Sequence, residues 1–456
     1  MKKIKKMLED KQFFAALLAI ALPITLQNLI GSSLNMVDTL MISMLGDASV
    51  AAVGLANQVY FFYMITVLGI QSGSSIFIAQ FWGKKDDKSI RKVLGLAIAI
   101  SSVLGLIFTF ATLFAPKYLM RLFTDDIEVL QLGSIYLQGV SLTYIITALS
   151  FVFGVASRSI GQAKMPMRAS LISFFINIIF NYLLMFGKLG FPALGVLGAA
   201  LGTLIARLVE LGIILFSIYG SHSILAMHWT DLITWERNFA KRYFKTTYPV
   251  IINEALWSLG MVMYSVAYAK ISTEAIAAVQ ISTNIQNIFL VLSRGLANAC
   301  TVMIGNKIGA NEEDEASTYA NRFLWIAVIQ GILLGIILYI SSPYIVKVFN
   351  NISEDVYIIS VQMLKIMALV FFIKMFNGNL IVGVLRGGGD TTFSMWLDAG
   401  AVWLVGVPLA FLGSVFLNIP VHWVTALVSL EEVVKAIIGI PRLISKKWII
   451  NITEDM

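Results

Sequence analysis

The sequence has few charged residues, one cysteine and three histidines, and each of these shortages excludes a class of protein. Charged residues make up 13% of the 456 residues, whereas soluble domains carry roughly 25%. The single cysteine, Cys300, cannot form a disulfide within the chain. His222, His228 and His422 are not spaced as metal ligands. The chain is therefore neither an ordinary soluble domain nor a disulfide-rich secreted protein, and we expect no metal centre.

Motifs for catalysis and nucleotide binding are also missing. The sequence has no Gly-x-Ser-x-Gly and no His-Glu-x-x-His, and its run Arg386-Gly-Gly-Gly-Asp390 lacks the Gly-Lys-Ser/Thr ending of a phosphate-binding loop. We interpret that run as a tight cytoplasmic turn between two spans. An ATP-driven pump would need a soluble nucleotide-binding domain, for which the chain has no room. We therefore predict that the protein is not an enzyme, with no catalytic residues and no cofactor.

Long hydrophobic runs dominate what is present, because 58% of the residues are hydrophobic. A membrane span needs about 20 mostly apolar residues and must be helical, since lipid cannot satisfy open backbone groups. The runs are too long for barrel strands, which have about 10 residues. We predict an all-α membrane protein with twelve transmembrane helices. The candidate spans are 13–34, 52–79, 92–115, 130–155, 168–187, 193–218, 246–269, 280–304, 323–346, 357–383, 393–416 and 421–441.

The basic residues predict the orientation of these spans. With the N-terminus inside, 24 of the 33 Lys and Arg residues fall in cytoplasmic segments and five in outer loops. Cytoplasmic segments of membrane proteins are enriched in Lys and Arg. The basic N-terminal segment has no signal-peptide cleavage site, so we expect it to be retained. We predict a multi-pass plasma (inner) membrane protein with both termini cytoplasmic, and no nucleic-acid partner despite the net charge of +7.

The two halves of the sequence resemble each other. A shift of 226 residues, or 228 further along, superimposes similar positions. The matched pairs include Pro23 with Pro249, Gly69 with Gly295, Arg158 with Arg386, and Gly161 with Gly389. Six spans per copy give both copies the same orientation, which predicts two six-helix bundles related by a parallel pseudo-two-fold repeat. We assign residues 1–218 to the N-terminal bundle, 219–245 to a cytoplasmic or interfacial linker, and 246–456 to the C-terminal bundle with a cytoplasmic tail.

Polar residues at depth in the first bundle are the leading site candidates. An ionisable residue in lipid costs about 2.5–3.5 kcal/mol on insertion scales, so each one needs a physical reason. Asp38 lies late in the first span. Asn177 and Asn181 share one face of the fifth span because they are four residues apart. With Thr203 of the sixth span they could hold a cation or a proton. The alternative is interhelical polar contact without a bound ion.

The second bundle offers weaker candidates. Glu254 and Lys374 carry opposite charges at depth, and we predict that they face the same interior space, either as a purely structural pair or near a functional cavity. Asp398 is a further candidate. Arg207 and Glu210, three residues apart in the sixth span, predict a local ion pair of mainly structural importance.

Proline occurs inside the first span of each half, at Pro23 and Pro249. Proline removes one helical hydrogen bond and allows a kink. Bends at equivalent places in two repeats suit a moving gate, so we predict a gating role for both residues. A fixed bend is the alternative.

These residues, taken in order, resemble the multidrug and toxic compound extrusion (MATE) family over nearly the whole length of the chain. No single motif carries the resemblance, but the ensemble in sequence order is specific. The matching features are Val37-Asp38-Thr39, Arg158, Asn177-x-x-x-Asn181, Pro249-x-x-x-x-Glu254, Arg386-Gly-Gly-Gly-Asp390-Thr and Trp403-x-x-x-x-Pro408.

The resemblance implies a secondary antiporter that expels bulky, amphipathic and often cationic compounds in exchange for H⁺ or Na⁺. In that family the acid matching Asp38 takes the ion, with partners matching Asn177, Asn181 and Thr203. One branch also uses the glutamate matching Glu254 with an acid on the tenth span, where this chain instead has Lys374-Met375-Phe376-Asn377. We expect a monomer whose partners are small amphipathic substrates and membrane lipid.

Two other functions are weighed against this one. A lipid-linked oligosaccharide flippase could share the bundle architecture, but such proteins often carry several cavity cations, and here Lys374 and Arg294 are the main ones. An intramembrane enzyme would need clustered acids, histidines or a metal set near a membrane face, and the sequence predicts none.

Overall fold

The computed structural model describes residues 10–227, 236–349 and 352–454, and these are almost entirely helical. Within these ranges the only β-type pairing is an isolated antiparallel bridge between Gly389 and Ile449. The basic segment 1–9 and part of the predicted linker, with His228, Trp229 and Trp235, lie outside the described residues.

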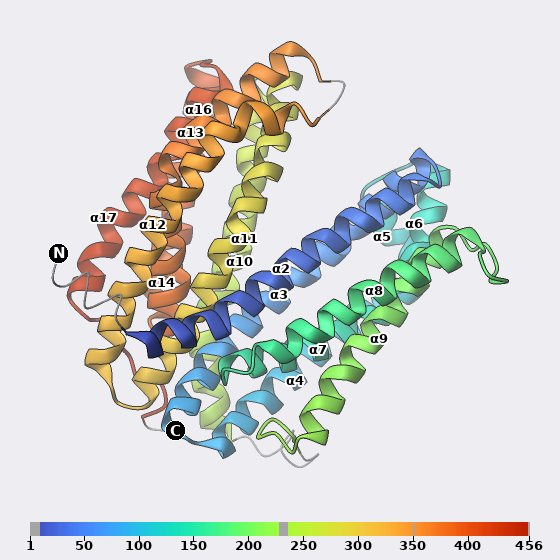
Figure 1. The fold of residues 1–456 in the computed structure, drawn as a ribbon. Helices are drawn as coiled ribbons and strands as arrows, with labels where there is room; N and C mark the ends of the chain where they lie inside the picture. Colours follow the sequence, from blue (N-terminus) through green and yellow to red (C-terminus); the bar gives the residue numbers. More distant parts are fainter. Residues whose placement is uncertain (1–9, 228–235, 350–351, 455–456) are drawn as a thin grey trace. The chain divides into compact units, whose positions relative to one another are not determined.

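Figure 1 shows the helices in chain order. The first half contains α2 (Lys11–Ser43), α3 (Asp47–Lys84), α4 (Asp87–Phe114), α5 (Pro116–Arg121), α6 (Ile127–Val140), α7 (Thr143–Ser159), α8 (Lys164–Phe186) and α9 (Val196–Gly220). The second half contains α10 (Arg237–Ala269), α11 (Thr273–Gly309), α12 (Glu313–Val346), α13 (Glu354–Gly378), η2 (Asn379–Arg386), α14 (Thr391–Ala401), η3 (Val402–Gly406), α15 (Val407–Phe411), η4 (Leu412–Phe416), α16 (Val421–Val428) and α17 (Leu430–Ile444).

These helices form twelve membrane spans. Among the described residues, ten helical stretches are long and apolar enough to cross a membrane, and the bent pair α6 and α7, at 47°, makes an eleventh. The stretches Glu354–Arg386 and Thr391–Phe416 each count as one span. The twelfth consists of α16 and α17, which follow each other across Ser429. The predicted all-α membrane fold with twelve spans is confirmed.

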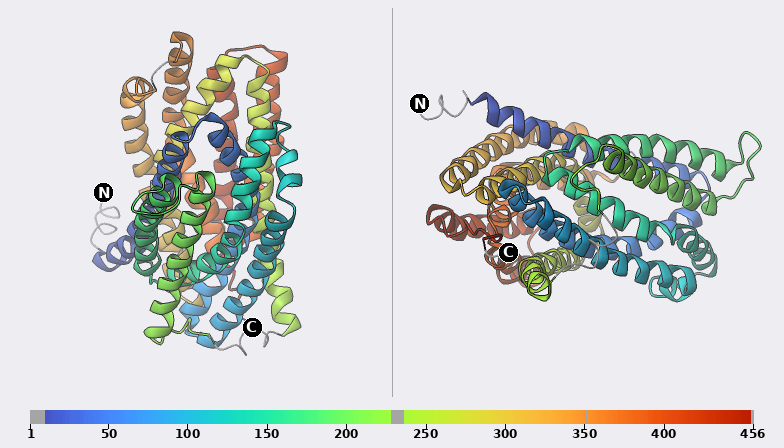
Figure 2. Two further views of the ribbon diagram at one scale, coloured as in Figure 1. Left: turned by 90° about the vertical axis from the view of Figure 1, so that its right-hand side faces the viewer. Right: turned by 90° about the horizontal axis from the view of Figure 1, so that it is seen from below.

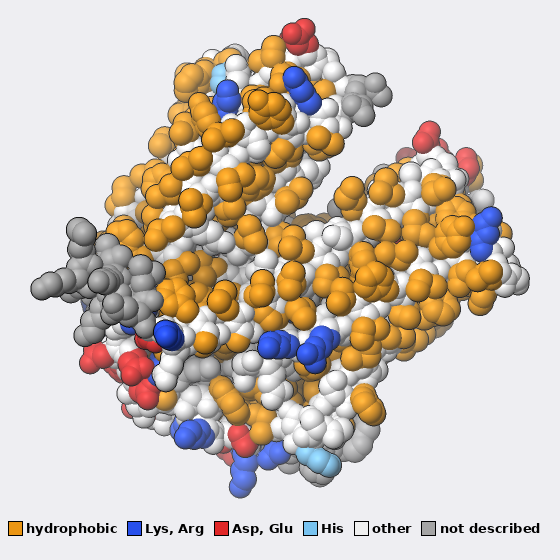
Figure 3. All heavy atoms as spheres, in the orientation of Figure 1, with side chains coloured by type: hydrophobic (Ala, Val, Ile, Leu, Met, Phe, Trp, Pro, Cys, Tyr) orange, Lys and Arg blue, Asp and Glu red, His pale blue; other side chains and the backbone are white. Residues whose placement is uncertain are grey.

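The surface is that of a membrane protein. Figure 3 shows hydrophobic side chains along the flanks of the helices, whereas Lys, Arg, Asp and Glu gather toward helix ends. Large apolar side chains such as Phe216 and Leu404 are about four-fifths exposed, at 80% and 78%. Water would penalise so much exposed apolar area, and lipid does not.

The chain divides into two compact units, each continuous in space but not in sequence. One unit comprises residues 22–82 and 86–244, and the other comprises 1–21, 83–85 and 245–456. The first eleven residues of α2 therefore group with the second half of the chain. Residues 237–245, which we had assigned to the linker, form the first turns of α10.

The unit containing residues 22–82 and 86–244 is held together by close helix pairs. The helices α8 and α9 run side by side in Figures 1 and 2, and α4 packs on α7. Glycine permits the closest approach, since a Cβ at Gly198 would lie 2.5 Å from the backbone of Leu184. At the core of the unit, the Tyr63 hydroxyl donates to the backbone oxygen of Tyr144 at 2.6 Å.

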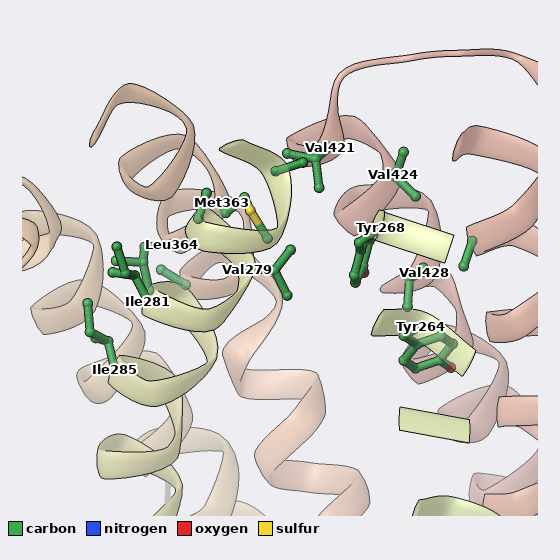
Figure 4. Close-up of a cluster of buried hydrophobic side chains, with 14 of the residues drawn as sticks. Tyr264, Tyr268, Val279, Ile281, Ile285, Met363, Leu364, Val421, Val424 and Val428 are labelled. Carbon is green, nitrogen blue, oxygen red and sulfur yellow. The ribbon is translucent and has the colours of Figure 1, made fainter. Parts of the chain in front are cut away.

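The other unit has an apolar core formed by α10, α11, α13 and α16. Figure 4 shows Ile281, Ile285 and Leu364 at one side of this core and Tyr264 beside Val428 at the other. Three π-helical segments, η2, η3 and η4, interrupt its tenth and eleventh spans. Such segments displace side chains from the regular helical register and are frequent at functional sites.

Two local predictions can now be compared with the structure. The Gly387–Gly389 run is a tight turn between η2 and α14, as predicted, and Gly389 adopts φ of 91°, where glycine is favoured. Pro23 and Pro249, where we predicted bends, lie inside α2 and α10, and both helices continue through the proline. A buried proline is accommodated there at the expense of one backbone hydrogen bond.

Candidate functional site

The four predicted residues of the first bundle lie in one hydrogen-bonded chain. The Asn181 amide donates from Nδ2 to Asp38 Oδ1 at 2.8 Å and to Asn177 Oδ1 at 3.0 Å. The Asn177 amide donates to Thr203 Oγ1 at 3.3 Å. Helices α2, α8 and α9 therefore each contribute to the chain, and the four-residue spacing on α8 aligns the two amides as predicted.

Asn181 is the centre of this arrangement. Its side chain is buried, and its Oδ1 atom has no hydrogen-bond partner within the described part of the chain. A Cβ at Gly202 of α9 would collide with that same oxygen. Glycine at this position therefore gives the amide room beside Asp38. A buried acceptor without a donor, next to a carboxylate, is a place where a cation or a proton is stabilised.

A second polar chain in this unit was missed by sequence reasoning, except for one pair. Arg158 donates to Gln27 Oε1 at 2.7 Å, and Gln27 donates to Ser170 Oγ at 2.9 Å. Ser170 donates to Glu210 Oε1 at 2.6 Å, and Arg207 pairs with Glu210 Oε2 at 2.7 Å. The Arg207–Glu210 ion pair is confirmed. Gln27 and Ser170 carry no charge, so no sequence signal distinguishes them from other polar residues.

In the second bundle, Glu254 and Lys374 each contact a different residue and do not form an ion pair with each other. Glu254 pairs with Arg386 at 2.7 Å, and the Arg386 side chain is 4% exposed. Lys374 instead donates to Gln286 Oε1 at 3.4 Å. We had placed Arg386 in a cytoplasmic loop, but η2 extends the tenth span and buries it. A buried guanidinium is the stronger competitor for the Glu254 carboxylate.

Asp398 belongs to a larger polar cluster. Its carboxylate accepts from Lys435 Nζ at 2.9 Å and from Asn253 Nδ2 at 3.0 Å. Lys435 also lies 3.6 Å from Glu431 Oε1, and the Tyr264 hydroxyl donates to Glu431 Oε2. Lys435 is one of the 24 basic residues that we assigned to cytoplasmic segments, whereas its side chain is 4% exposed.

Sequence reasoning also passed over the acids Glu431 and Glu432, both buried on α17. A usable signal was present, since three charged residues within five positions interrupt the twelfth span. In lipid, such a group has to face the interior of a bundle. In the part of the chain that the structure describes, no group of three or more His, Cys, Asp or Glu could hold a metal ion.

Comparisons with known proteins agree with this architecture. The MatE family model matches residues 23–183 and 249–412. An uncharacterized transporter of Bacillus subtilis, YisQ, is 25% identical over 96% of both chains. A probable multidrug resistance protein NorM of Thermotoga maritima is 24% identical, covering 87% of this chain and 84% of its own. A structure described as the outward-facing conformation of a multidrug resistance MATE family transporter has a TM-score of 0.86, with 20% identity over 95% of this chain and 96% of its own.

Proposed function

The chain belongs to the MatE family of membrane transporters, and on that premise we propose that it is a secondary antiporter that exports amphipathic, often cationic compounds in exchange for H⁺ or Na⁺. Proteins of this family are transporters and not enzymes, and the chain is a multi-pass member of it. The substrate class is suggested by similar proteins described as probable multidrug resistance proteins.

One observation carries the coupling role, namely the hydrogen bond from Asn181 Nδ2 to Asp38 Oδ1 among membrane-spanning helices. When Asp38 is ionised, it accepts from Asn181, and Arg207 attracts it electrostatically. When Asp38 takes a proton, it loses that attraction. Binding of Na⁺ would instead draw in the free Oδ1 of Asn181, which has no donor among the described residues. Either ion changes the contacts between α2 and α8.

The proposed cycle links this change to substrate release. A cytoplasmic compound binds while Asp38 is deprotonated, and the protein then opens outward. A proton or Na⁺ from outside binds at Asp38, and α2 bends near Pro23, where proline removes one backbone hydrogen bond. The bend displaces the substrate. Pro249 provides the equivalent position in α10.

The distribution of basic residues supports a plasma (inner) membrane orientation with both termini cytoplasmic, and we propose that the transporter works as a monomer. In this orientation the N-terminal bundle, the connecting segment 219–245 and the C-terminal bundle follow each other along the chain.

The direct test reconstitutes the purified protein in liposomes and measures efflux of a cationic dye under a pH gradient alone and then under a Na⁺ gradient alone. We expect one of the two gradients to drive efflux. Asp38→Asn should abolish gradient-driven efflux, because the amide cannot take up the ion, while the protein stays folded and inserted. Asp47→Asn, at the start of α3, is the matched control and should retain efflux.

Normal efflux by the Asp38→Asn protein would remove Asp38 from the mechanism. Movement of a lipid-linked oligosaccharide without dependence on either gradient would instead favour a flippase.

A further inference from the structure

Three carboxylates in the second bundle lie near a single ammonium group, and two of them are within ion-pair distance of it. Asp398 on α14 and Glu431 and Glu432 on α17 form this carboxylate cluster, with Lys435 between Asp398 and Glu431. The exposed fractions are 15% for the Asp398 side chain, 8% for Glu431 and 4% for Lys435. Glu432 as a residue is 8% exposed. The cluster is therefore enclosed by the helices of the unit.

The charges around the carboxylate cluster do not balance. Arg386 attracts Asp398, but it is already paired with Glu254 at 2.7 Å. Lys374 attracts Glu431, although its hydrogen bond goes to Gln286. Arg294 also attracts Glu254, so Arg386 is shared between Glu254 and Asp398. At ion-pair distance, however, Lys435 is the one cation of the described residues beside the carboxylate cluster, and it pairs with Asp398 and Glu431 but not with Glu432. A buried charge without a partner is expensive among membrane helices.

Hydrogen-bond donors are also too few. The carboxylate cluster receives the Tyr264 hydroxyl at Glu431, the Asn377 amide at Glu432 Oε2 (2.8 Å) and the Asn253 amide at Asp398. Asn253 and Asn377 are 1% and 2% exposed, yet the Oδ1 atom of each finds no donor among the residues that the structure describes. Buried acceptors in proteins normally have a partner. The site thus lacks both a donor and a positive charge.

The internal repeat places this site at the counterpart of the Asp38 site. The shift of 226 residues carries Asp38 to Tyr264, and the later shift of 228 carries Thr203 to Glu431. A Cβ at Gly406, the last residue of η3, would collide with the Tyr264 hydroxyl and with Glu431. Gly406 therefore makes room for this pair, much as Gly202 makes room for Asn181 beside Asp38.

We propose that the carboxylate cluster binds one proton, shared between Glu431 and Glu432. The proton comes from water and forms an O–H bond with a carboxylate oxygen, which removes one negative charge and creates one donor. The proton therefore supplies the missing positive charge and one of the two missing donors. Tyr268, another buried tyrosine of α10, does not alter the charge balance, because a phenol with an ordinary pKa of about 10 is uncharged at neutral pH. The second bundle thus has its own protonation site, on residues other than Glu254.

The test is infrared spectroscopy of the purified protein in lipid nanodiscs, without substrate or gradient, so its outcome is independent of antiport. A protonated carboxyl gives a carbonyl-stretch band distinct from those of carboxylates. We expect this band near neutral pH, and its loss in both Glu431→Gln and Glu432→Gln. Asp38→Asn should leave the band of the cluster in place. Glu354→Gln, an exposed acid in the first turn of α13, is the control and should leave the spectrum unchanged.

Tyr264→Phe keeps both acids and removes only the hydroxyl donor, so it should shift the band and leave its intensity unchanged. It also keeps the test decisive if a glutamine variant fails to fold. The proposal is overturned if folded Glu431→Gln and Glu432→Gln both retain the band, or if Tyr264→Phe leaves its position unchanged. It is equally overturned if Na⁺ added at constant pH removes the band, because Na⁺ would then be the bound ion.

Discussion

Both bundles contain the same arginine contact, but the arginine meets a neutral amide in one bundle and a carboxylate in the other. In the first bundle Arg158 Nη1 donates to the Gln27 amide oxygen at 2.7 Å, and in the second Arg386 Nη1 donates to the Glu254 carboxylate at 2.7 Å. Each arginine ends the fourth span of its bundle, and each partner lies on the first. The geometry is repeated while the charge of the partner is not. The repeat thus preserves the positions at which the helices touch, while the charge of the residues at each contact differs between the bundles.

Replacing each arginine by alanine should give the largest difference in stability between the two contacts. Arg386→Ala leaves the Glu254 carboxylate without its buried partner and should lower the free energy of unfolding by about 3–5 kcal/mol. Arg158→Ala loses a hydrogen bond to a neutral amide that Ser170 still contacts, and should cost about 1.5–3 kcal/mol. Detergent-titrated unfolding of both variants in mixed micelles measures the difference. Equal losses would mean that the carboxylate adds nothing to the contact.

Two glycines of α9, Gly202 and Gly212, differ in the space around an added Cβ. Gly202→Ala places a Cβ against Asn181 and should cost about 1–3 kcal/mol by overpacking, with weaker ion-driven efflux. Gly212→Ala, on the same helix α9, is the matched control because no atom lies within 4 Å of its added Cβ. Unfolding and dye efflux should be measured on both. If the two variants behave alike, Gly202 is not needed for the geometry around Asp38.

Exchanging the two partners tests the comparison directly. Glu254→Gln gives the second bundle the amide of the first, keeps a hydrogen bond to Arg386 and should lose about 1 kcal/mol, since bonds between charged groups are the stronger ones. Gln27→Glu gives Arg158 a carboxylate but loses the donor to Ser170, so the two effects should nearly cancel and change the free energy of unfolding by less than about 1 kcal/mol. Melting temperatures of the two single variants and of the double variant provide the measurement. A loss in Gln27→Glu larger than in Glu254→Gln would reverse the comparison.

The smallest expected effect lies at the beginning of α2. Arg322 donates to Asp10 at 2.6 Å, and this bond lowers the pKa of the Asp10 carboxyl, with help from the backbone N–H of Phe13. A lowered pKa stabilises the fold above the pKa of the unfolded carboxyl, and that stabilisation disappears as the pH falls through the folded value. Because Asp10 is about one-third exposed, we expect about 0.2–1 kcal/mol.

Asp10→Asn should abolish that part of the pH dependence and leave stability at low pH unchanged. Thermal unfolding between neutral and acidic pH, with Asp125→Asn as an exposed control, gives the measurement. An unchanged pH profile in Asp10→Asn would show that the pair does not contribute.

The sequence predicted the spans and the repeat because each has a local or additive signal, whereas the partners of Asp38 on other helices were implied by the resemblance to the MATE family. Hydrophobic length defines a span, and a four-residue spacing on α8 aligns Asn177 with Asn181. The partner of Glu254 was not accessible in this way. Its choice depends on η2, whose register buries Arg386, and no hydrophobic pattern indicates a π-helical segment.

The carboxylate cluster escaped prediction for a different reason. Lys435 was assigned to a cytoplasmic segment because basic residues near the end of a span are usually outside lipid. Glu431 lies four residues before Lys435 on α17 and was a usable local signal, whereas Asp398 comes from α14 and meets Lys435 only in the folded bundle. Pairwise charge compensation between distant segments is not visible in a single sequence.

The division of α2 has a consequence for taking the protein apart. Residues 11–21 group with one compact unit and residues 22–43 with the other, so the boundary falls one position before Pro23. A gene cut at the segment 219–245 would yield two fragments, one carrying eleven helical residues that belong to the other unit. Neither fragment is then a complete folding module. Co-expressed halves should assemble efficiently only when residues 11–21 of the N-terminal fragment can pack with the C-terminal fragment.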